Sequence, residues 1–301
     1  MTISLFIFFA FSFSMLVSQQ EKQRTNSFRN INYDLSTPDR IYILPKSLHE
    51  ISGITEIDMT SIACIQDEHG ILFIYDLLKN EIKKQSYFGS NGDYEGIARV
   101  DNSIYVLRSD GVLFGIINYE SSGFKRVFYN TGIPSGDNEG LCYDQKNNRL
   151  LIAPKISIGK DKNIRVIYSF DLHSKKVIKE PAYELDMSAI KQFAQDNKID
   201  VPTEGHKKGG KGKPDIKFRP SAIAVHPLTN RLYVLSAIDR MLFVFDIKGN
   251  IEFLSTLDPD TFKQPEGITF LKNGDMLISN EGQNKKPTIV RFNYKGTRLK
   301  Q

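Results

Sequence analysis

The sequence predicts an all-β protein, a single β-propeller built from five four-stranded blades. Three observations predict this fold. A unit recurs at intervals of 43 to 45 residues, each unit holds short apolar or alternating runs between turn residues, and the last unit lacks one run that the N-terminal region can supply. The 301-residue composition, 40% hydrophobic and 25% charged, is that of a globular protein.

The repeat is marked by a small residue at the start of an apolar run. Successive intervals between these positions are 43, 44, 82 and 45 residues, so the third interval decides the blade count. It contains one complete set of four runs and then an insertion, residues 187–218, which begins with the helix-like SAIKQFAQ and ends in a glycine- and lysine-rich loop. We therefore expect five blades, with six as the alternative. The aligned positions are Gly53, Gly96, Gly140, Ala222 and Gly267.

Individual units show the expected strands in order. The second unit contains GIARV, SIYVLRSD, LFGIINY and FKRVFYN, and the fourth contains AIAVH, RLYVLSAI, MLFVFDI and IEFLSTL. The fifth unit has three runs only. RIYILP, residues 40–45, precedes the first unit and is expected to close the ring as the missing strand, which gives a propeller domain over 38–296.

The N-terminal region is expected to direct export. Residues 1–18 contain an apolar run from Ile3 to Val17 followed by Ser18 and the charged EKQR, a pattern typical of a signal peptide, and residues 19–37 are expected to be a linker. The run is too short for a comfortable membrane span. We expect a periplasmic or secreted protein; the alternative is an outward-facing protein held at the membrane by an uncleaved signal anchor.

Charge and cysteine content exclude some functions. Four lysines of the net charge of +5 lie in HKKGGKGK, residues 206–213, where no aromatic residue is interleaved, so we expect a solvated loop, mobile over 204–217, and no nucleic-acid partner. Cys64 and Cys142 lie in apolar runs of different units and are expected to be buried free thiols.

Acidic residues recur at the start of the first strand of several units. Glu95, Glu139 and Glu266 each precede a glycine and an apolar run. Because neighbouring strands run antiparallel, the start of a blade's first strand and the end of its second share one sheet edge, and the innermost strands line the central channel. These side chains are therefore expected to meet at the channel mouth. Further acids expected there are Glu50, Asp93 and Asp137, and the expected ligand-binding residues are Asp67, Glu68, Arg108, Lys155, Ser236, Asn280 and Glu281.

Crowded carboxylates favour a bound cation. Like charges must take up protons, pair with Lys or Arg, or bind an ion. Calcium is predicted because the cluster offers oxygen ligands without histidine or cysteine beside them. One copy of the motif is explained by a turn with a solvated glutamate, whereas three copies on one face favour a functional cluster. Arg108 and Lys155 could instead neutralise the acids or bind an anionic group. The predicted metal ligands are Glu95, Glu139, Glu266, Glu50, Asp93 and Asp137.

Several segments together resemble a known family. LHEISGI, GDYEGIARVDNSIYVLRSDGVLF, DNEGLCYD, PSAIAVHPLTNRLYVLSAIDRMLFVFDIKG and PEGITFLKNGDMLISNE are similar to the SdiA-regulated family of bacterial β-propellers over roughly residues 38 to 295. The resemblance implies an exported, calcium-binding propeller whose biochemical role is not settled. Related propellers of the gluconolactonase-like and esterase-like phytase kinds place metal and catalytic acids at this mouth. Ser236 and Ala237 stand where an acid is expected in the fourth blade.

Three function classes follow. The first is a module that binds a small molecule, a glycan or a protein at the acidic channel face. The second is a metal-dependent hydrolase of an ester, lactone or phosphoester, in which calcium polarises the substrate and a carboxylate acts as base. The third is an envelope scaffold or adhesion module. The sequence lacks G-x-S-x-G and a Ser-His-Asp set, so binding ranks above hydrolysis.

Overall fold

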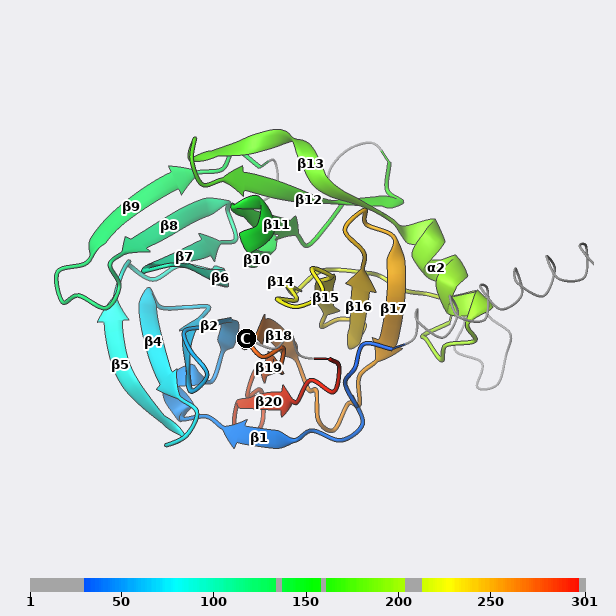
Figure 1. The fold of residues 1–301 in the computed structure, drawn as a ribbon, viewed down its shortest axis with the longest axis horizontal. Helices are drawn as coiled ribbons and strands as arrows, with labels where there is room; N and C mark the ends of the chain where they lie inside the picture. Colours follow the sequence, from blue (N-terminus) through cyan, green and yellow to red (C-terminus); the bar gives the residue numbers. More distant parts are fainter. Residues whose placement is uncertain (1–29, 134–136, 158–160, 204–212, 298–301) are drawn as a thin grey trace, which may run out of the picture.

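A computed structural model describes residues 30–133, 137–157, 161–203 and 213–297. Five antiparallel four-stranded sheets stand around a central channel, as Figure 1 shows. The prediction of a five-bladed propeller is confirmed. The predicted signal peptide lies outside the described residues.

Each blade uses four consecutive strands, except that the fifth takes its outermost strand from the N-terminal region. Blade one contains β2 (Ile51–Glu56), β3 (Ser61–Gln66), β4 (Ile71–Asp76) and β5 (Glu81–Tyr87). Blade two contains β6 (Tyr94–Val100), β7 (Ser103–Arg108), β8 (Val112–Ile117) and β9 (Lys125–Asn130). Blade three contains β10 (Asn138–Asp144), β11 (Arg149–Pro154), β12 (Ile164–Asp171) and β13 (Lys176–Asp186). Blade four contains β14 (Ala222–Val225), β15 (Leu232–Ser236), β16 (Met241–Phe245) and β17 (Ile251–Thr256). Blade five contains β18 (Pro265–Phe270), β19 (Met276–Asn280), β20 (Thr288–Phe292) and β1 (Arg40–Ile43).

The ring closes through β1, as the three-run fifth unit predicts. β1 pairs antiparallel with β20 from Arg40 opposite Arg291 to Ile43 opposite Thr288. The innermost strands contact one another in the order β2, β6, β10, β14, β18 and back to β2. The first and last strands of the described residues are thereby paired in one blade, and the five innermost strands surround the channel.

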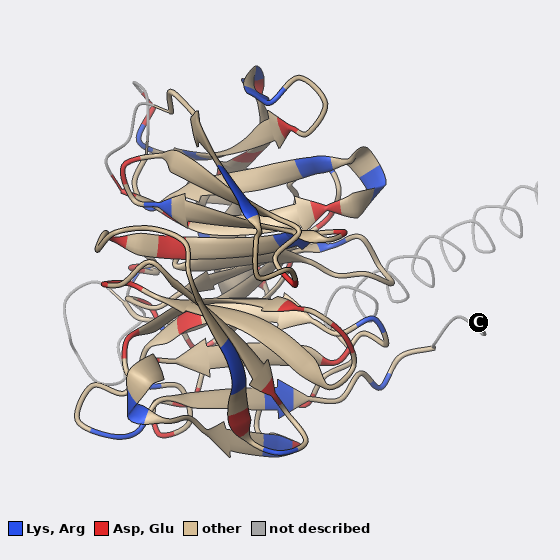
Figure 2. Cartoon of the chain, turned by 90° about the vertical axis from the view of Figure 1, so that its left-hand side faces the viewer, with Lys and Arg blue, Asp and Glu red and all other residues tan. Residues whose placement is uncertain are grey.

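The core lies between the blades. The second and third strands are almost fully buried because they are covered on both faces by neighbouring blades, whereas the outermost β5 alternates between exposed and half-buried residues. Each buried cluster combines two blades; one of them packs Ile65 of blade one against Val106 of blade two. On the side turned to the viewer in Figure 2, acidic and basic residues are mixed over the edges of the blades.

The insertion between blades three and four begins with helix α2 (Met187–Asp196), where the sequence predicts a helix. Asp186 caps it by accepting a hydrogen bond from the Ser188 amide at 2.7 Å. Part of the segment predicted to be mobile, residues 204–212, lies outside the described residues. In the remainder, Lys213 and Lys217 are exposed, whereas Ile216 is only 3% exposed. Mobility of this segment stays a prediction.

The described residues also contain two short helices, part of the predicted linker and both cysteines. Two 3-10 helices, η1 (Lys46–Leu48) and η2 (Gln145–Asn147), connect strands. Within the predicted linker, Ile31 is buried and the Tyr33 hydroxyl lies 2.8 Å from Nε2 of His226. Cys64 and Cys142 are buried free thiols, as predicted. Of the helices in the described residues, none has the length and apolar character to cross a membrane.

Candidate ligand site at the channel mouth

A β-bulge stands at the start of four of the five innermost strands. The register with the second strand shifts just before Gly53, Gly96, Gly140 and Gly267, which leaves one unpaired residue ahead of each glycine. Bulges re-aim a side chain and are common next to functional sites. In blade four, Ser221 precedes Ala222 in the same place. The five equivalent positions, four of them at a bulge, are in ring order Ser52, Glu95, Glu139, Ser221 and Glu266.

The glycine after each bulge permits a close approach between blades. A Cβ atom added at Gly96 would lie 2.9 Å from the Leu141 amide nitrogen and 3.0 Å from the Glu139 carbonyl oxygen. At Gly53 the corresponding distance is 3.2 Å, to the Glu95 carbonyl oxygen. Packing between blades thus explains the glycine of the recurrent Glu-Gly pair. It does not explain the glutamate.

The two serines at these equivalent positions hold neighbouring blades together. Ser52 Oγ donates to the Tyr94 carbonyl oxygen at 2.6 Å, and Ser221 Oγ donates to the Pro265 carbonyl oxygen at 2.8 Å. Each bond reaches the residue just before the next blade's glutamate. These hydroxyls therefore fix the backbone from which Glu95 and Glu266 project.

The mouth glutamates, Glu95, Glu139 and Glu266, are brought close enough together to affect one another's ionisation. Burial raises the pKa of Glu95, and the negative charges of Glu139, Asp93 and Glu266 raise it further. Burial, followed by the charges of Glu139 and Glu281, raises the pKa of Glu266 to about 8. Carboxyl groups from three blades thus influence one another's ionisation at one end of the channel.

Lys155 offsets part of this charge. Its Nζ atom lies 2.6 Å from Oε1 of Glu139 and 3.8 Å from Oδ1 of Asp137. Glu139 is only 3% exposed, so burial raises its pKa while the lysine opposes that rise. Lys155 therefore neutralises one of the three mouth glutamates and leaves an excess of carboxyl groups.

Further acids form a second group beside the mouth, between blades one and five. Burial and then the charges of Glu50, Glu68 and Asp93 raise the pKa of Asp67 to about 6. Burial and then the charges of Asp67 and Glu50 raise the pKa of Glu281 to about 7. The predicted acids are therefore not scattered over the face but arranged around the three-glutamate centre.

Other predicted ligand-binding residues lie apart from the mouth glutamates. Arg108 Nε and Nη2 donate to Asp110 at 2.9 and 2.7 Å, so this arginine does not neutralise the mouth glutamates. Glu68 is exposed, with one carboxylate oxygen 3.6 Å from His69. Ser236 is fully buried and donates to Asp239 at 2.6 Å.

Asn280 is also buried, at 2% exposed. Its Nδ2 atom donates to Thr288 Oγ1 at 3.2 Å. The side chain is thus tied to β20 of its own blade, although its position at the end of β19 is the one that the strand pattern predicts.

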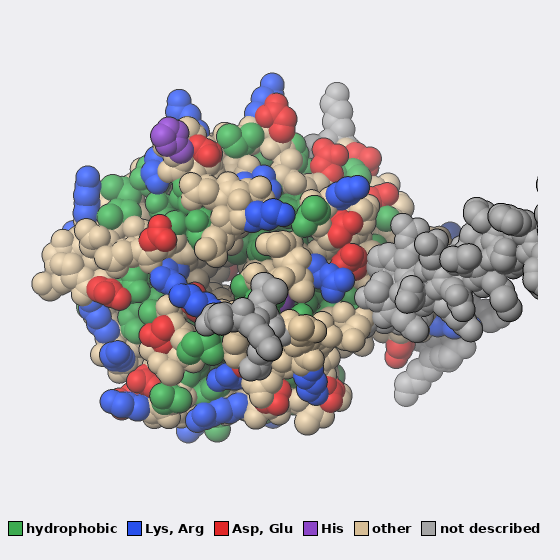
Figure 3. Space-filling view, viewed as in Figure 1, with side chains coloured by type: hydrophobic (Ala, Val, Ile, Leu, Met, Phe, Trp, Pro, Cys, Tyr) green, Lys and Arg blue, Asp and Glu red, His purple; other side chains and the backbone are tan. Residues whose placement is uncertain are grey.

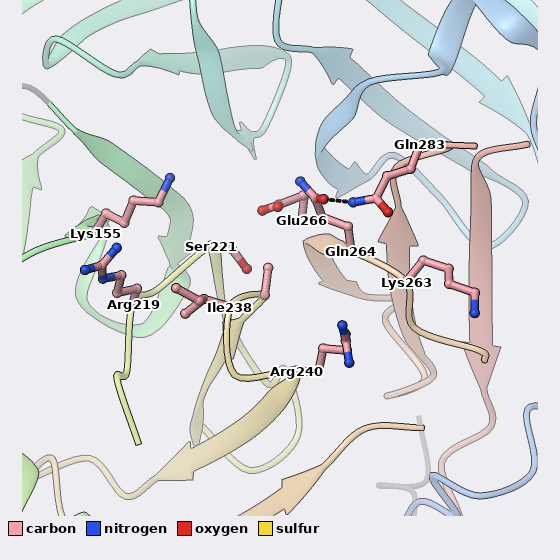
Figure 4. A pocket seen from close by; sticks show the side chains of 10 residues that line it. Lys155, Arg219, Ser221, Ile238, Arg240, Lys263, Gln264, Glu266 and Gln283 are labelled. Atoms are coloured by element: carbon pink, nitrogen blue, oxygen red, sulfur yellow. Dashed lines mark hydrogen bonds between the residues drawn. The ribbon is translucent and has the colours of Figure 1, made fainter. Parts of the chain in front are cut away.

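A cavity of about 350 Å³ opens beside Glu266, between blades three, four and five. Figure 4 shows Glu266 pointing into it from β18 toward the blade that carries Lys155. The blades follow one another in opposite rotational order in Figures 1 and 4, so Figure 4 shows the side of the ring opposite to Figures 1 and 3. The face seen in Figure 3 carries both acidic and basic side chains. The cavity is lined by Lys155, Arg219, Ser221, Ala237, Ile238, Arg240, Lys263, Gln264, Glu266 and Gln283.

Sequence analysis did not anticipate the basic wall of this cavity. Arg219, Arg240 and Lys263 come from the end of the insertion, the turn after β15 and the segment before β18. The sequence did contain one signal. Ser236 and Ala237 stand where an acid is expected, and Arg219 and Arg240 flank the hairpin that contains them. Blade four thus contributes cations where blades two, three and five contribute acids.

The mouth offers the oxygen donors that a hard cation prefers. As placed, however, the described residues contain no group of three or more His, Cys, Asp or Glu side chains that could hold a metal ion. The arrangement does present carboxylates, a lysine and a cavity that together can bind charged groups of a small molecule.

Comparisons with known proteins establish the fold. No protein-family model matches the sequence, and no curated protein matches it. Among solved structures, the glutaminyl cyclase of Myxococcus xanthus is 13% identical, with 85% of this chain and 94% of that chain covered and a TM-score of 0.56. A streptogramin B lyase is 13% identical over 86% of this chain and 71% of that chain, with a TM-score of 0.44. The virginiamycin B lyase of Staphylococcus aureus is 14% identical over 86% and 72%, with a TM-score of 0.43. At 13% identity, the likeness to the glutaminyl cyclase is one of fold alone.

Proposed function

We propose that this propeller binds a small ligand at the channel mouth and that the mouth glutamates receive a positively charged group of that ligand. The observation that carries the proposal is the meeting of three glutamates from three blades, with Lys155 offsetting one of them. Perturbed ionisation of carboxyl groups beside a cavity is characteristic of functional sites. The export and the relationship to the SdiA-regulated family expected from the sequence belong to the same proposal.

The charge balance explains why a cation would bind. Buried carboxylates that repel one another are costly, and without a partner they take up protons. A cation that enters among Glu95, Glu139 and Glu266 removes the repulsion and replaces those protons. Binding is then coupled to proton release, and it strengthens as the pH rises toward about 8, the pKa of Glu266.

The cation is either an organic ammonium group or a metal ion. The described side chains do not form a ready metal-binding group, so an ammonium group of the ligand fits the arrangement better. Calcium stays a prediction from the all-oxygen donor set, and both cations are included in the test.

The test is a melting experiment with matched variants. Millimolar calcium, a chelator, and pairs of small primary amines with their acetylated forms are compared. A ligand at a hundredfold excess over Kd stabilises the native state by about 2.7 kcal/mol, which gives a readily measured rise in melting temperature. Glu95→Gln should abolish the rise, and Glu180→Gln, at an exposed position of β13, should keep it.

Two results would contradict the proposal. One is an unchanged melting temperature of the wild-type protein with every cation. The other is an equal response of Glu95→Gln and Glu180→Gln, which would place the binding elsewhere.

Hydrolysis of an ester or lactone is a second candidate, favoured by one specific observation. The raised pKa of Glu95 favours its protonated form, and a protonated carboxyl group at the channel mouth can act as a general acid. Release of acid from ester and lactone substrates, measured for wild type and Glu95→Gln, tests this candidate. Equal rates for the two proteins would remove it.

A further inference from the structure

The cavity beside Glu266 has two arginines in its wall that are not used by the fold. Lys155 is bonded to Glu139, and Lys263 lies 3.0 Å from Asp260. Arg219 and Arg240, by contrast, are exposed, and neither side chain forms a hydrogen bond or ion pair with any of the described residues. Two guanidinium groups with free donors therefore line a space large enough for a small molecule.

Asp239, an acid on the same turn as Arg240, forms its hydrogen bonds with other groups. Asp239 accepts hydrogen bonds from the backbone amides of Lys217 and Phe218, at 2.9 and 2.8 Å, and from Ser236 Oγ at 2.6 Å. Both carboxylate oxygens are thus taken up by the backbone and a hydroxyl group. This arrangement fastens the end of the insertion, which carries one arginine, to the turn that carries the other.

The backbone at both arginines is held in place. Phe218 is fully buried at a φ of 46°, and its ring packs edge-to-face on Phe243 with 4.7 Å between centroids. Arg240 has a φ of 47°, and its carbonyl oxygen accepts a hydrogen bond from the Leu257 amide at 2.8 Å. A fixed backbone at both positions reduces the main-chain entropy that is lost when a ligand binds there.

We infer that the basic wall of this cavity binds anionic groups of the ligand, carboxylates or phosphates, through Arg219 and Arg240, whose guanidinium groups lie on either side of Ile238 in Figure 4. Guanidinium groups offer forked donors that match the oxygens of both anions. The inference rests on the proposed function, because it assigns the second charged group of the same ligand. The ligand is then a small molecule with a cationic group at the mouth glutamates and an anionic group at the arginines.

The test measures the two charged groups separately. Melting temperatures are compared in inorganic phosphate, in acetate and in chloride, at equal ionic strength. Phosphate or acetate should raise the melting temperature of the wild-type protein above its value in chloride. The double variant Arg219→Gln/Arg240→Gln should lose this rise, with affinity reduced at least about tenfold. Arg126→Gln, an exposed arginine on β9, is the matched control and should keep it.

The outcomes separate this inference from the proposed function. Loss of the anion response in the double variant, with the response to calcium or amines kept, supports it. Glu95→Gln should show the reverse pattern. An equal anion response in the double variant and in Arg126→Gln, or no anion response in the wild-type protein, would overturn it, whatever the cations do.

Discussion

The two ends of the central channel are built from the same five strands, yet they treat their charges in opposite ways. At the end opposite the mouth, Glu56 of β2 lies 3.3 Å from Nη2 of Arg99 on β6, and Arg99 Nε also donates to the Glu56 carbonyl oxygen at 3.0 Å. Apolar and hydroxyl side chains line the remaining space, a cavity of about 120 Å³. At the mouth, three glutamates meet and Lys155 pairs with one of them.

The difference is the one that the proposed binding function predicts. Pairing of Glu56 with Arg99 connects blades one and two by an ion pair. At the mouth, glutamates occupy three bulge positions, and Lys155 pairs with one of them. Under the proposed function, carboxyl groups that oppose folding are kept at the mouth because they bind a ligand.

The largest effect on stability is expected from loss of Lys155, the lysine at the mouth. Lys155→Met leaves the 3%-exposed Glu139 without its partner and should destabilise the protein by about 3 kcal/mol at neutral pH. Adding Glu139→Gln should restore most of the loss, because the uncompensated charge is gone. Chemical denaturation measures both, with Lys79→Met at an exposed pair as control. An unchanged stability of Lys155→Met would show that the pair contributes nothing.

Replacement of a glutamate by glutamine should change the stability of the protein in opposite directions at the two ends of the channel. Glu56→Gln weakens a half-buried ion pair and should destabilise by about 1 to 2 kcal/mol. Glu266→Gln removes a repelling charge and should stabilise by about 1 kcal/mol near pH 9, above its pKa of about 8. Urea unfolding of the two variants side by side decides this, and destabilisation by both would erase the contrast.

The pH dependence follows from the direction of the shifts. The mouth glutamates have raised pKa values in the folded state, so the native protein binds more protons than the unfolded chain above the ordinary glutamate pKa. This contribution to stability is complete at low pH and is lost as the pH rises toward about 8 for Glu266. The free energy of unfolding should therefore decline from about pH 5 to about pH 9. This decline should be smaller in Glu266→Gln and unaltered in Glu56→Gln. Identical slopes in all three proteins would contradict the assignment.

The smallest effect is expected at the serines of the ring. Ser52→Ala and Ser221→Ala each remove one hydrogen bond between blades and should cost about 1 kcal/mol. Thermal melting measures this loss, and Ser255→Ala, whose hydroxyl bonds to the next residue on β17, serves as control. If neither serine matters more than Ser255, the bonds do not hold the blades together.

Much of the fold followed from periodicity. The 43- to 45-residue repeat fixes the number of blades, and the missing fourth run fixes the closure by β1. The convergence of Glu95, Glu139 and Glu266 also followed, because equal positions in a closed ring face a common axis. The bulges themselves did not, since a register shift leaves no mark in an apolar run.

The basic side of the site could not be predicted for a different reason. Arg219 is positioned by Phe218 and by the bonds that Asp239 makes to the backbone, and these tertiary contacts carry no periodic signal. Ser236 was expected to face a ligand from the end of β15. An aspartate three residues later binds its hydroxyl group instead and keeps it buried.

The central claim is that the mouth holds carboxyl groups with raised pKa values, which lose their protons when a cation binds. Carbon NMR of the glutamate carboxyl groups, titrated with and without a bound cation, tests it most directly. We predict a resonance that titrates near pH 8, disappears in Glu266→Gln, and shifts to lower pH when calcium or an amine ligand is added. Titration of every glutamate in the ordinary range, about 4 to 5, with no response to any cation, would contradict the claim.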